Sequence, residues 1–111
     1  MGERGRIRFM RIIVMYDLPV GEAQERHEYS KFRQFLVGDG YTRLQNSVYT
    51  RLAVDTKNAD AAIVRLKANL PEAGLVQVLR VSEASFCSML TLCGIPFDEG
   101  HIVTGEDFIV L

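Results

Sequence analysis

The spacing of apolar residues predicts a buried β-strand close to the start of the chain. Residues 10–16 form a nearly continuous apolar run, interrupted only by Arg11. Such a run is typical of a central strand that is covered on both faces. The strand is expected to end at Asp17 and Pro19, because proline has no N–H to donate to a strand ladder.

Over residues 21–37 the apolar period changes to that of an amphipathic helix. Three large apolar residues fall on one face of this helix: Tyr29, Phe32 and Leu36. Gly38 or Gly40 can supply the left-handed residue that closes it. The pattern therefore predicts a helix that packs one side against the sheet.

Two further strands are predicted over residues 41–45 and 47–54, where apolar and polar residues alternate. Asn46 lies between them and is a natural turn or bulge residue. Asn58 is predicted to cap a second helix that runs to about Leu70. Its apolar stripe would consist of Ala59, Ile63, Leu66 and Leu70.

Pro71 and Gly74 are expected to terminate the second helix, and residues 75–81 are predicted to form a fourth strand. The order β-α-β-β-α-β predicts an α+β fold of the ferredoxin-like type. Helices would cover one sheet face, and a second subunit is the simplest cover for the other. We therefore expect a homodimer formed through the sheet faces.

The part of the chain after the fourth strand is predicted to extend this unit. Ser82 is expected to open a short helix, and residues 89–93 and 107–111 are predicted to be added edge strands. We thus expect a short leader over residues 1–8 and a ferredoxin-like domain over residues 9–94. The C-terminal extension, residues 95–111, would carry an edge strand that docks on the partner protomer or on another subunit.

Composition narrows the class of protein. A chain of 111 residues with 48% hydrophobic residues fits one domain with one core. No run approaches the roughly 20 apolar residues that span a bilayer, and the N-terminus lacks the apolar core of a signal peptide. We expect a cytoplasmic protein. Cys87 and Cys93 have no zinc-binding spacing and are expected to be buried, reduced thiols.

The charged residues are distributed unevenly, although the net charge is only −1. Residues 1–51 carry nine Lys and Arg against six Asp and Glu, whereas residues 82–111 carry five acidic residues and no Lys or Arg. Such asymmetry can conceal a basic surface that binds phosphates. The candidates for nucleic-acid binding are Arg26, Lys31, Arg33, Arg43 and Arg51.

Asp17 is the candidate catalytic and metal-binding residue, because it is the only acid in the first strand segment. A carboxylate at a strand end is a hard oxygen ligand for Mg²⁺, which is usually held by one or two carboxylates together with water and phosphate. Such a metal would activate water and neutralise a phosphoryl transition state. In the other interpretation, Asp17 accepts hydrogen bonds within its own turn.

Three motifs of the sequence resemble the Cas2 family, the smaller of the two core CRISPR adaptation proteins. They are Tyr-Asp-Leu-Pro at residues 16–19, Gln-Asn-Ser-Val-Tyr at residues 45–49 after a glycine, and Val-Ser-Glu-Ala-Ser-Phe at residues 81–86. Their order and spacing are also those of the family. The helix segment over residues 29–36 is most similar to members from type II systems.

The resemblance implies a ferredoxin-like homodimer that bridges two dimers of the larger CRISPR integrase subunit. That complex inserts short pieces of foreign double-stranded DNA as new spacers. Some members are metal-dependent endonucleases on RNA or DNA, with one aspartate from each subunit at the dimer axis; this aspartate matches Asp17. Residues 20–25 form an acidic loop where some members carry arginines, and Asn46 replaces an aromatic or apolar residue.

Further residues of these motifs are candidates for supporting roles. Tyr16 could stack or hold the dimer, or simply pack in the core. Arg43, Ser47 and Tyr49 would share one sheet face if no bulge intervenes. Arg43 could then hold phosphate through its fork of donors, while Tyr49 stacks or supports the site.

Three functional hypotheses remain open from the sequence. The first is a homodimeric adaptor in the integrase complex, in which Asp17 is dispensable. The second is a Mg²⁺-dependent phosphodiesterase that uses Asp17 from each subunit. The third is a separate nuclease toxin or regulatory domain, because a ferredoxin-like fold does not by itself determine function.

Overall fold

The computed structural model describes residues 9–96 of the chain and contains four strands and three helices. The expected leader, the end of the C-terminal extension and the edge strand over residues 107–111 lie outside the described residues. The elements, in chain order, are β1 (Met10–Asp17), α1 (Ala23–Gly38), β2 (Thr42–Gln45), β3 (Val48–Ala53), α2 (Thr56–Lys67), β4 (Leu75–Ser82) and α3 (Glu83–Cys87).

The four strands form one antiparallel sheet in the spatial order β2-β3-β1-β4. β1 and β3 are central, and β4 is an edge strand that pairs with β1 along its whole length. This order, together with the β-α-β-β-α-β sequence of elements, is the ferredoxin-like arrangement. The predicted α+β fold is therefore confirmed.

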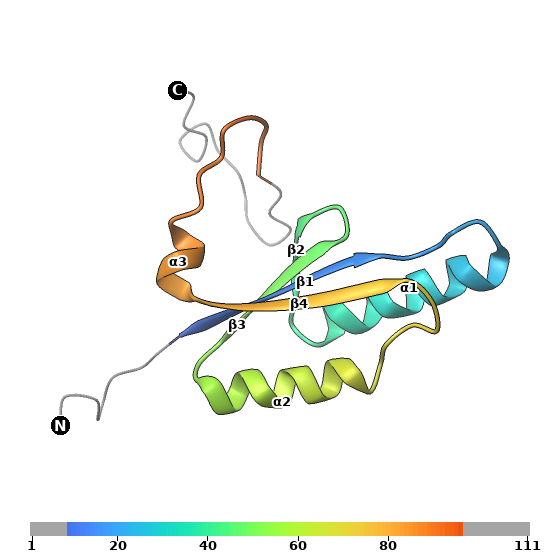
Figure 1. The fold of residues 1–111 in the computed structure, drawn as a ribbon, viewed down its shortest axis with the longest axis horizontal. Helices are drawn as coiled ribbons and strands as arrows, with labels where there is room; N and C mark the ends of the chain where they lie inside the picture. The colour runs from blue at the N-terminus through green and yellow to red at the C-terminus, as the bar shows by residue number, and fades with distance from the viewer. Residues whose placement is uncertain (1–8, 97–111) are drawn as a thin grey trace.

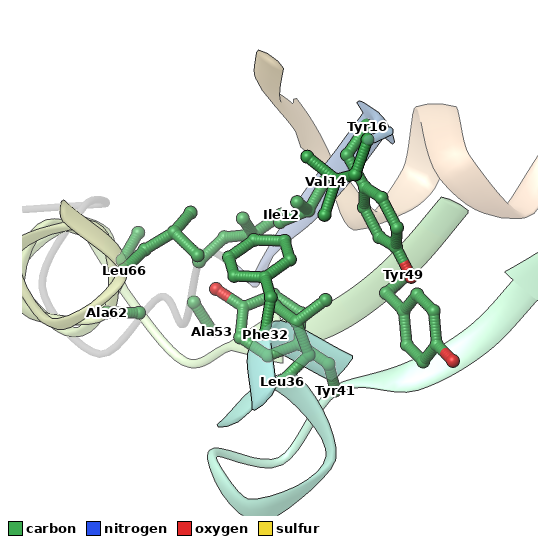
Figure 2. Close-up of a cluster of buried hydrophobic side chains, with 12 residues drawn as sticks. Ile12, Val14, Tyr16, Phe32, Leu36, Tyr41, Tyr49, Ala53, Ala62 and Leu66 are labelled. Atoms are coloured by element: carbon green, nitrogen blue, oxygen red, sulfur yellow. The ribbon is translucent and has the colours of Figure 1, made fainter. Parts of the chain in front are cut away.

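One face of the sheet is covered by α1 and α2, which lie on the same side of it (Figure 1). Ile12, Val14 and Tyr16 of β1 point to this side and are buried. Phe32 and Leu36 of α1 pack on them, as the sequence pattern predicted (Figure 2). The helix α2 adds Ala59, Ala62 and Leu66 to the same core.

The other face of the sheet has no cover from the described part of the chain. It carries the odd-numbered residues of β1, among them Ile13 and Met15, which are only half-buried. Leu52 of β3 and Leu79 of β4 lie on the same face and are 41% and 49% exposed. A single chain therefore covers β1 on one side only, and we call this uncovered side the open face.

The helix starts differ in part from the sequence prediction. The second helix is capped by Asp55 and not by Asn58, since the Asp55 carboxylate accepts the N–H of Asn58 at 2.7 Å. Asn58 lies inside the first turn, where its side chain accepts the N–H of Val54 at 3.3 Å. Ser82 does cap α3 as predicted, by accepting the N–H of Ser85 at 3.0 Å.

The ends of α1 and α2 and the turn between β2 and β3 differ in detail from the sequence prediction. Gly40, and not Gly38, takes the left-handed conformation after α1, with a φ of 95°. The helix α2 ends at Lys67, so Leu70 falls outside it and is 48% exposed. The turn between β2 and β3 contains Ser47, whose φ of 62° is positive.

The segment after α3 does not form the predicted edge strand. Residues 89–93 are irregular, because an edge strand needs a neighbour to pair with and the described residues offer none. Cys87 and Cys93 are free thiols but both are exposed, so the prediction that they are buried is wrong. They fall in or beside α3 and its tail, which have no buried residue.

Candidate metal and nucleic-acid site

Asp17 is the last residue of β1 and lies at one end of the open face. It is opposite Leu75 of β4 in the strand register and shares the side of the sheet with Ile13 and Met15. Its side chain is exposed, and within residues 9–96 no hydrogen bond to its carboxylate is formed. The carboxylate is thus available to a ligand, which a turn-capping aspartate would not be.

The end of β1 is held in place by the loop that leads into β4. Gly74 has a φ of 100°, and a Cβ atom there would lie 2.7 Å from the backbone oxygen of Asp17. The same atom would lie 2.7 Å from the Leu18 side chain, which is buried. Only glycine permits this close approach and this conformation together, so Gly74 determines where Asp17 sits.

Tyr16 points away from Asp17, into the core beneath the sheet (Figure 2). Its ring is edge-on to Phe32 at 5.3 Å and to Tyr29 at 6.0 Å, and stacks with Tyr49 at 6.1 Å. Its hydroxyl is buried without a hydrogen-bond partner of proper geometry among the described residues. Burial, with further repulsion from Tyr49 and Tyr29, raises the pKa of Tyr16 well above its usual value. Tyr16 is a packing residue in the single chain.

Tyr49 and Ser47 occupy different parts of the hairpin. Tyr49 is buried on the helix side of β3, and its hydroxyl accepts a hydrogen bond from Nε of Arg33 at 3.1 Å. Ser47 lies in the turn, where its backbone oxygen accepts the N–H of Tyr16 at 3.0 Å. The two motif residues therefore support β1 from two sides and do not form one surface.

Arg43 lies next to a bulge in β2. It is opposite Tyr49 in the register, and the register shifts between Arg43 and Gln45. Its guanidinium donates to the side chain of Asn46 in the turn. Directly opposed residues lie on the same face of a sheet, so Arg43 and Tyr49 do share a side, as the sequence suggested, whereas Ser47 lies in the turn and not on that strand face.

The basic residues of α1 are split between different sides of the helix. Arg26 and Arg33 lie about two turns apart on one side, whereas Lys31 is rotated by roughly 140° from Arg26 at 3.6 residues per turn. Arg26 donates to the backbone oxygens of Val20 and Gly21, both at 3.1 Å. The three cations do not form one stripe along the helix.

Arg51 points to the helix side of the sheet and is tied to the end of α1. Its guanidinium donates to the backbone oxygen of Asp39 and lies 3.6 Å from the Asp39 carboxylate. Arg65 of α2 donates to the same carboxylate at 2.9 Å and 3.1 Å. Arg51 thus connects β3 to both helices, and its charge is directed into the fold.

Comparison with known proteins identifies the family. A sequence model described as CRISPR associated protein Cas2 matches residues 10–89. The chain belongs to the Cas2 family. The CRISPR-associated endoribonuclease Cas2 of Acidovorax ebreus (strain TPSY) is 47% identical over 87 residues, which cover 78% of this chain and 85% of that protein. The protein of the same name from Treponema denticola is 38% identical over 102 residues, which cover 92% of this chain and all of that protein.

A solved structure supports the Cas2 fold. It bears the description "Crystal structure of cas2" and superposes with a TM-score of 0.51 at 19% identity, covering 86% of this chain and 99% of that one. At this identity the likeness concerns the fold alone. Membership of the family rests on the sequence matches, which confirm the resemblance carried by the three motifs.

A single Cas2 chain offers only part of a magnesium site. Within the described residues, no three His, Cys, Asp or Glu side chains come together to hold a metal ion. Asp17 fits the donor chemistry, as an exposed carboxylate at a strand end. A second carboxylate from another chain would make two, and magnesium usually takes one or two carboxylates from protein.

Across residues 9–96, no helix is long and apolar enough to cross a membrane.

The sequence analysis missed several residues that shape this region. Asp39 and Arg65 were not singled out, although they orient Arg51. Gly74 was predicted to end the second helix, but its contact with Asp17 was not. Pairing of Asp39 with arginines 12 and 26 residues away had no local signal, because it depends on how α1, β3 and α2 pack.

Proposed function

We propose that this Cas2 family protein works as a homodimeric adaptor in CRISPR adaptation. In this role it joins copies of the larger integrase subunit and supports the double-stranded DNA that is inserted as a new spacer. The family assignment supports the role. The two exposed, unpaired cysteines suit the reducing cytoplasm, which is where we propose that it acts.

The observation that carries the adaptor proposal is the open face. Four apolar side chains on it, Ile13, Met15, Leu52 and Leu79, have nothing above them in the described residues. Burying an apolar surface of this kind stabilises association by about 25 cal/mol for each Å² removed from water. A second copy placed face to face would remove both surfaces at once.

The same pairing gives Asp17 a defined place. Each chain contributes one carboxylate at the end of its open face, so two chains related by a two-fold axis can bring two together. Such a pair could hold Mg²⁺, which supplies charge neutralisation and an activated water for cleavage of a phosphodiester. The protein's own contribution is to keep the carboxylates exposed and in position, through Gly74 and the buried Leu18.

A charged residue introduced on the apolar open face tests the dimer. Leu79→Lys places a cation where the second copy would pack, and the side chain is already 49% exposed, so the monomer should fold. Val64→Lys is the matched control, since Val64 is 65% exposed on α2, on the other side of the sheet. We expect L79K to be monomeric by light scattering while V64K remains dimeric. Equal masses for the two variants would refute the face-to-face pairing.

A second candidate function, metal-dependent cleavage of RNA or DNA, is favoured by the unpartnered Asp17 carboxylate. It is also in keeping with the relatives named endoribonucleases. The test compares Asp17→Asn with Asp60→Asn, which removes an exposed carboxylate on α2. Spacer integration is measured with the integrase subunit, and cleavage without it. Integration that survives D17N supports the adaptor, and cleavage lost only in D17N supports the nuclease.

A further inference from the structure

A groove at the outer end of the helix layer adjoins Asp17 through Leu18, but neither Asp17 nor the apolar residues of the open face line it. It lies between the loop after β1, the first turns of α1 and the loop that leads into β4. Its volume is about 170 Å³. Leu18, Pro19, Pro71 and Ala73 give it an apolar lining, and Glu25, Glu28 and Glu72 also border it, although the surface inside the hollow is almost wholly apolar. We call it the glutamate groove.

The charge of the glutamate groove is not balanced from within. None of its lining residues is Lys, Arg or His. Glu25 accepts the N–H of Glu22 at 3.0 Å, while Glu28 and Glu72 form no ion pair with the described residues. Three carboxylates around an apolar hollow therefore lack a cation in the described part of the chain.

The size and charge of the glutamate groove exclude several occupants. Sites for drug-sized molecules usually measure about 300–1,000 Å³, so the groove holds a side chain or two and not a cofactor. Phosphates are repelled by the glutamates, which excludes a nucleic-acid strand. The three carboxylates do not gather into a metal-binding group, as no such group occurs in the described residues.

We propose that the glutamate groove is a docking site for a segment of a partner protein in which an apolar side chain stands next to arginine or lysine. The apolar side chain would enter between Leu18, Pro71 and Ala73, and the flanking cations would meet Glu28 and Glu72. An adjoining hollow of about 90 Å³ shares Glu28 and Pro71 with the groove, but Lys31 also lines it, so the basic segment would be confined to the glutamate groove itself. This surface goes beyond the adaptor proposal, because it lies on the helix side and not on the open face.

The test uses the whole folded chain and a short synthetic peptide, Gly-Arg-Leu-Arg-Gly, with amide chemical shifts as the readout. We expect shifts at Leu18 and Ala73, and affinity about threefold lower in each of Glu28→Gln and Glu72→Gln. Asp60→Asn removes an exposed carboxylate elsewhere and should leave affinity unchanged. Ala73→Leu fills the hollow without altering charge, and should lower affinity at least about fivefold.

Each remaining outcome would overturn the proposal. Equal binding by Gly-Arg-Ser-Arg-Gly would mean that no apolar side chain enters. Unchanged affinity in A73L would mean that the peptide binds only to surface charge, and unchanged affinity in E28Q and E72Q would remove the charge complementarity. Absence of binding at millimolar peptide would show that the groove takes no such segment. Light scattering of each variant is measured in parallel, so that failure of the dimer is seen separately.

Discussion

Arg11 and Glu83 are joined by two hydrogen bonds, at 2.8 Å and 2.5 Å, although 72 residues separate them along the chain. The Arg11 guanidinium also lies 4.4 Å from the centre of the Phe86 ring. The N–H of Glu83 donates to the backbone oxygen of Phe9 at 3.1 Å. These contacts attach α3 to the start of β1 and so set the direction in which the chain continues after Cys87.

We expect Glu83→Gln to lower the free energy of unfolding by about 1–2 kcal/mol, since it weakens a pair of charge-assisted hydrogen bonds that is partly buried. The matched control is Arg80→Met, which breaks an ion pair of 2.6 Å with Asp60 whose side chains are much more exposed. That loss should stay below about 1 kcal/mol. Urea denaturation measures both, and equal losses would contradict a special role for Arg11 and Glu83.

The same pair should make stability depend on acidity. The hydrogen bonds from Arg11 hold the pKa of Glu83 below its usual value. A carboxyl group whose pKa is lowered by folding stabilises the folded state fully at pH values above its pKa in the unfolded chain, which is about 4.3 for glutamate. This stabilisation is lost as the pH falls through the pKa of the group in the folded chain. We expect the wild type to lose more stability than E83Q as the pH falls from about 5 to about 3, a range that includes the unfolded value. Parallel curves for the two proteins would refute this assignment.

Gly74→Ala should destabilise the fold and displace Asp17. The new Cβ atom would meet the Asp17 backbone and the Leu18 side chain at 2.7 Å, in a conformation with positive φ. Such strain costs on the order of 1–3 kcal/mol. Gly38→Ala is the control, because a Cβ there meets nothing within 4 Å and the residue is helical. It should be neutral or stabilise by up to about 1 kcal/mol in thermal unfolding. A neutral G74A would show that the loop is free to move.

Asp39→Asn should weaken the junction of α1, β3 and α2. The carboxylate holds Arg65 and Arg51, and its side chain is only 18% exposed. Leaving two cations without this partner should cost about 1–3 kcal/mol. A double-mutant cycle of D39N with Arg65→Met measures the coupling. Additive losses would mean that the contact contributes nothing to stability.

Tyr16→Phe and Tyr49→Phe remove the same atom from neighbouring rings and should differ in effect. The Tyr16 hydroxyl is buried without a partner in the described residues, so its removal should be neutral or stabilising. The Tyr49 hydroxyl accepts from Arg33, and its removal should cost about 0.5–1.5 kcal/mol. Chemical denaturation at neutral pH measures both, and a large loss in Y16F would reveal a partner for that hydroxyl.

Alkaline pH provides a second readout for Tyr16. Because burial raises its pKa in the folded state, the unfolded chain loses this proton first, and stability should fall as the pH rises above about 10. Y16F lacks this group and should lose less stability over the same range. Equal losses in the two proteins would show that Tyr16 does not titrate differently on folding.

Periodicity alone was sufficient to predict the order of the elements and the buried sides of β1 and α1. It could not resolve choices between near neighbours. Asp55 and Asn58 are both good helix caps three residues apart, and only the path of the chain out of β3 selects Asp55. The bulge after Arg43 and the positive φ of Ser47 take Ser47 out of the strand face that Arg43 and Tyr49 share, and the alternation of residue types does not reveal this.

For the candidate site, the sequence motifs located Asp17 but not its surroundings. The family motif indicated an aspartate at the end of the first strand, and the structure has it exposed there. The roles of the basic residues were harder to predict, because the sequence does not show which arginines form hydrogen bonds or ion pairs within the folded chain. Arg26, Arg33 and Arg51 all donate to groups of the same chain, which depends on tertiary packing.

The unpaired edge of β4 affects the risk that the newly synthesised protein aggregates. Within residues 9–96 its outer edge faces no other strand, so a row of backbone donors and acceptors is left beside exposed Leu75, Val78 and Leu79. Edges of this kind are templates for misassembly. A face-to-face pair leaves this edge uncovered, so a further strand can still add to it there, and a crowded pool of newly made chains would be at greater risk of aggregation than a dilute one.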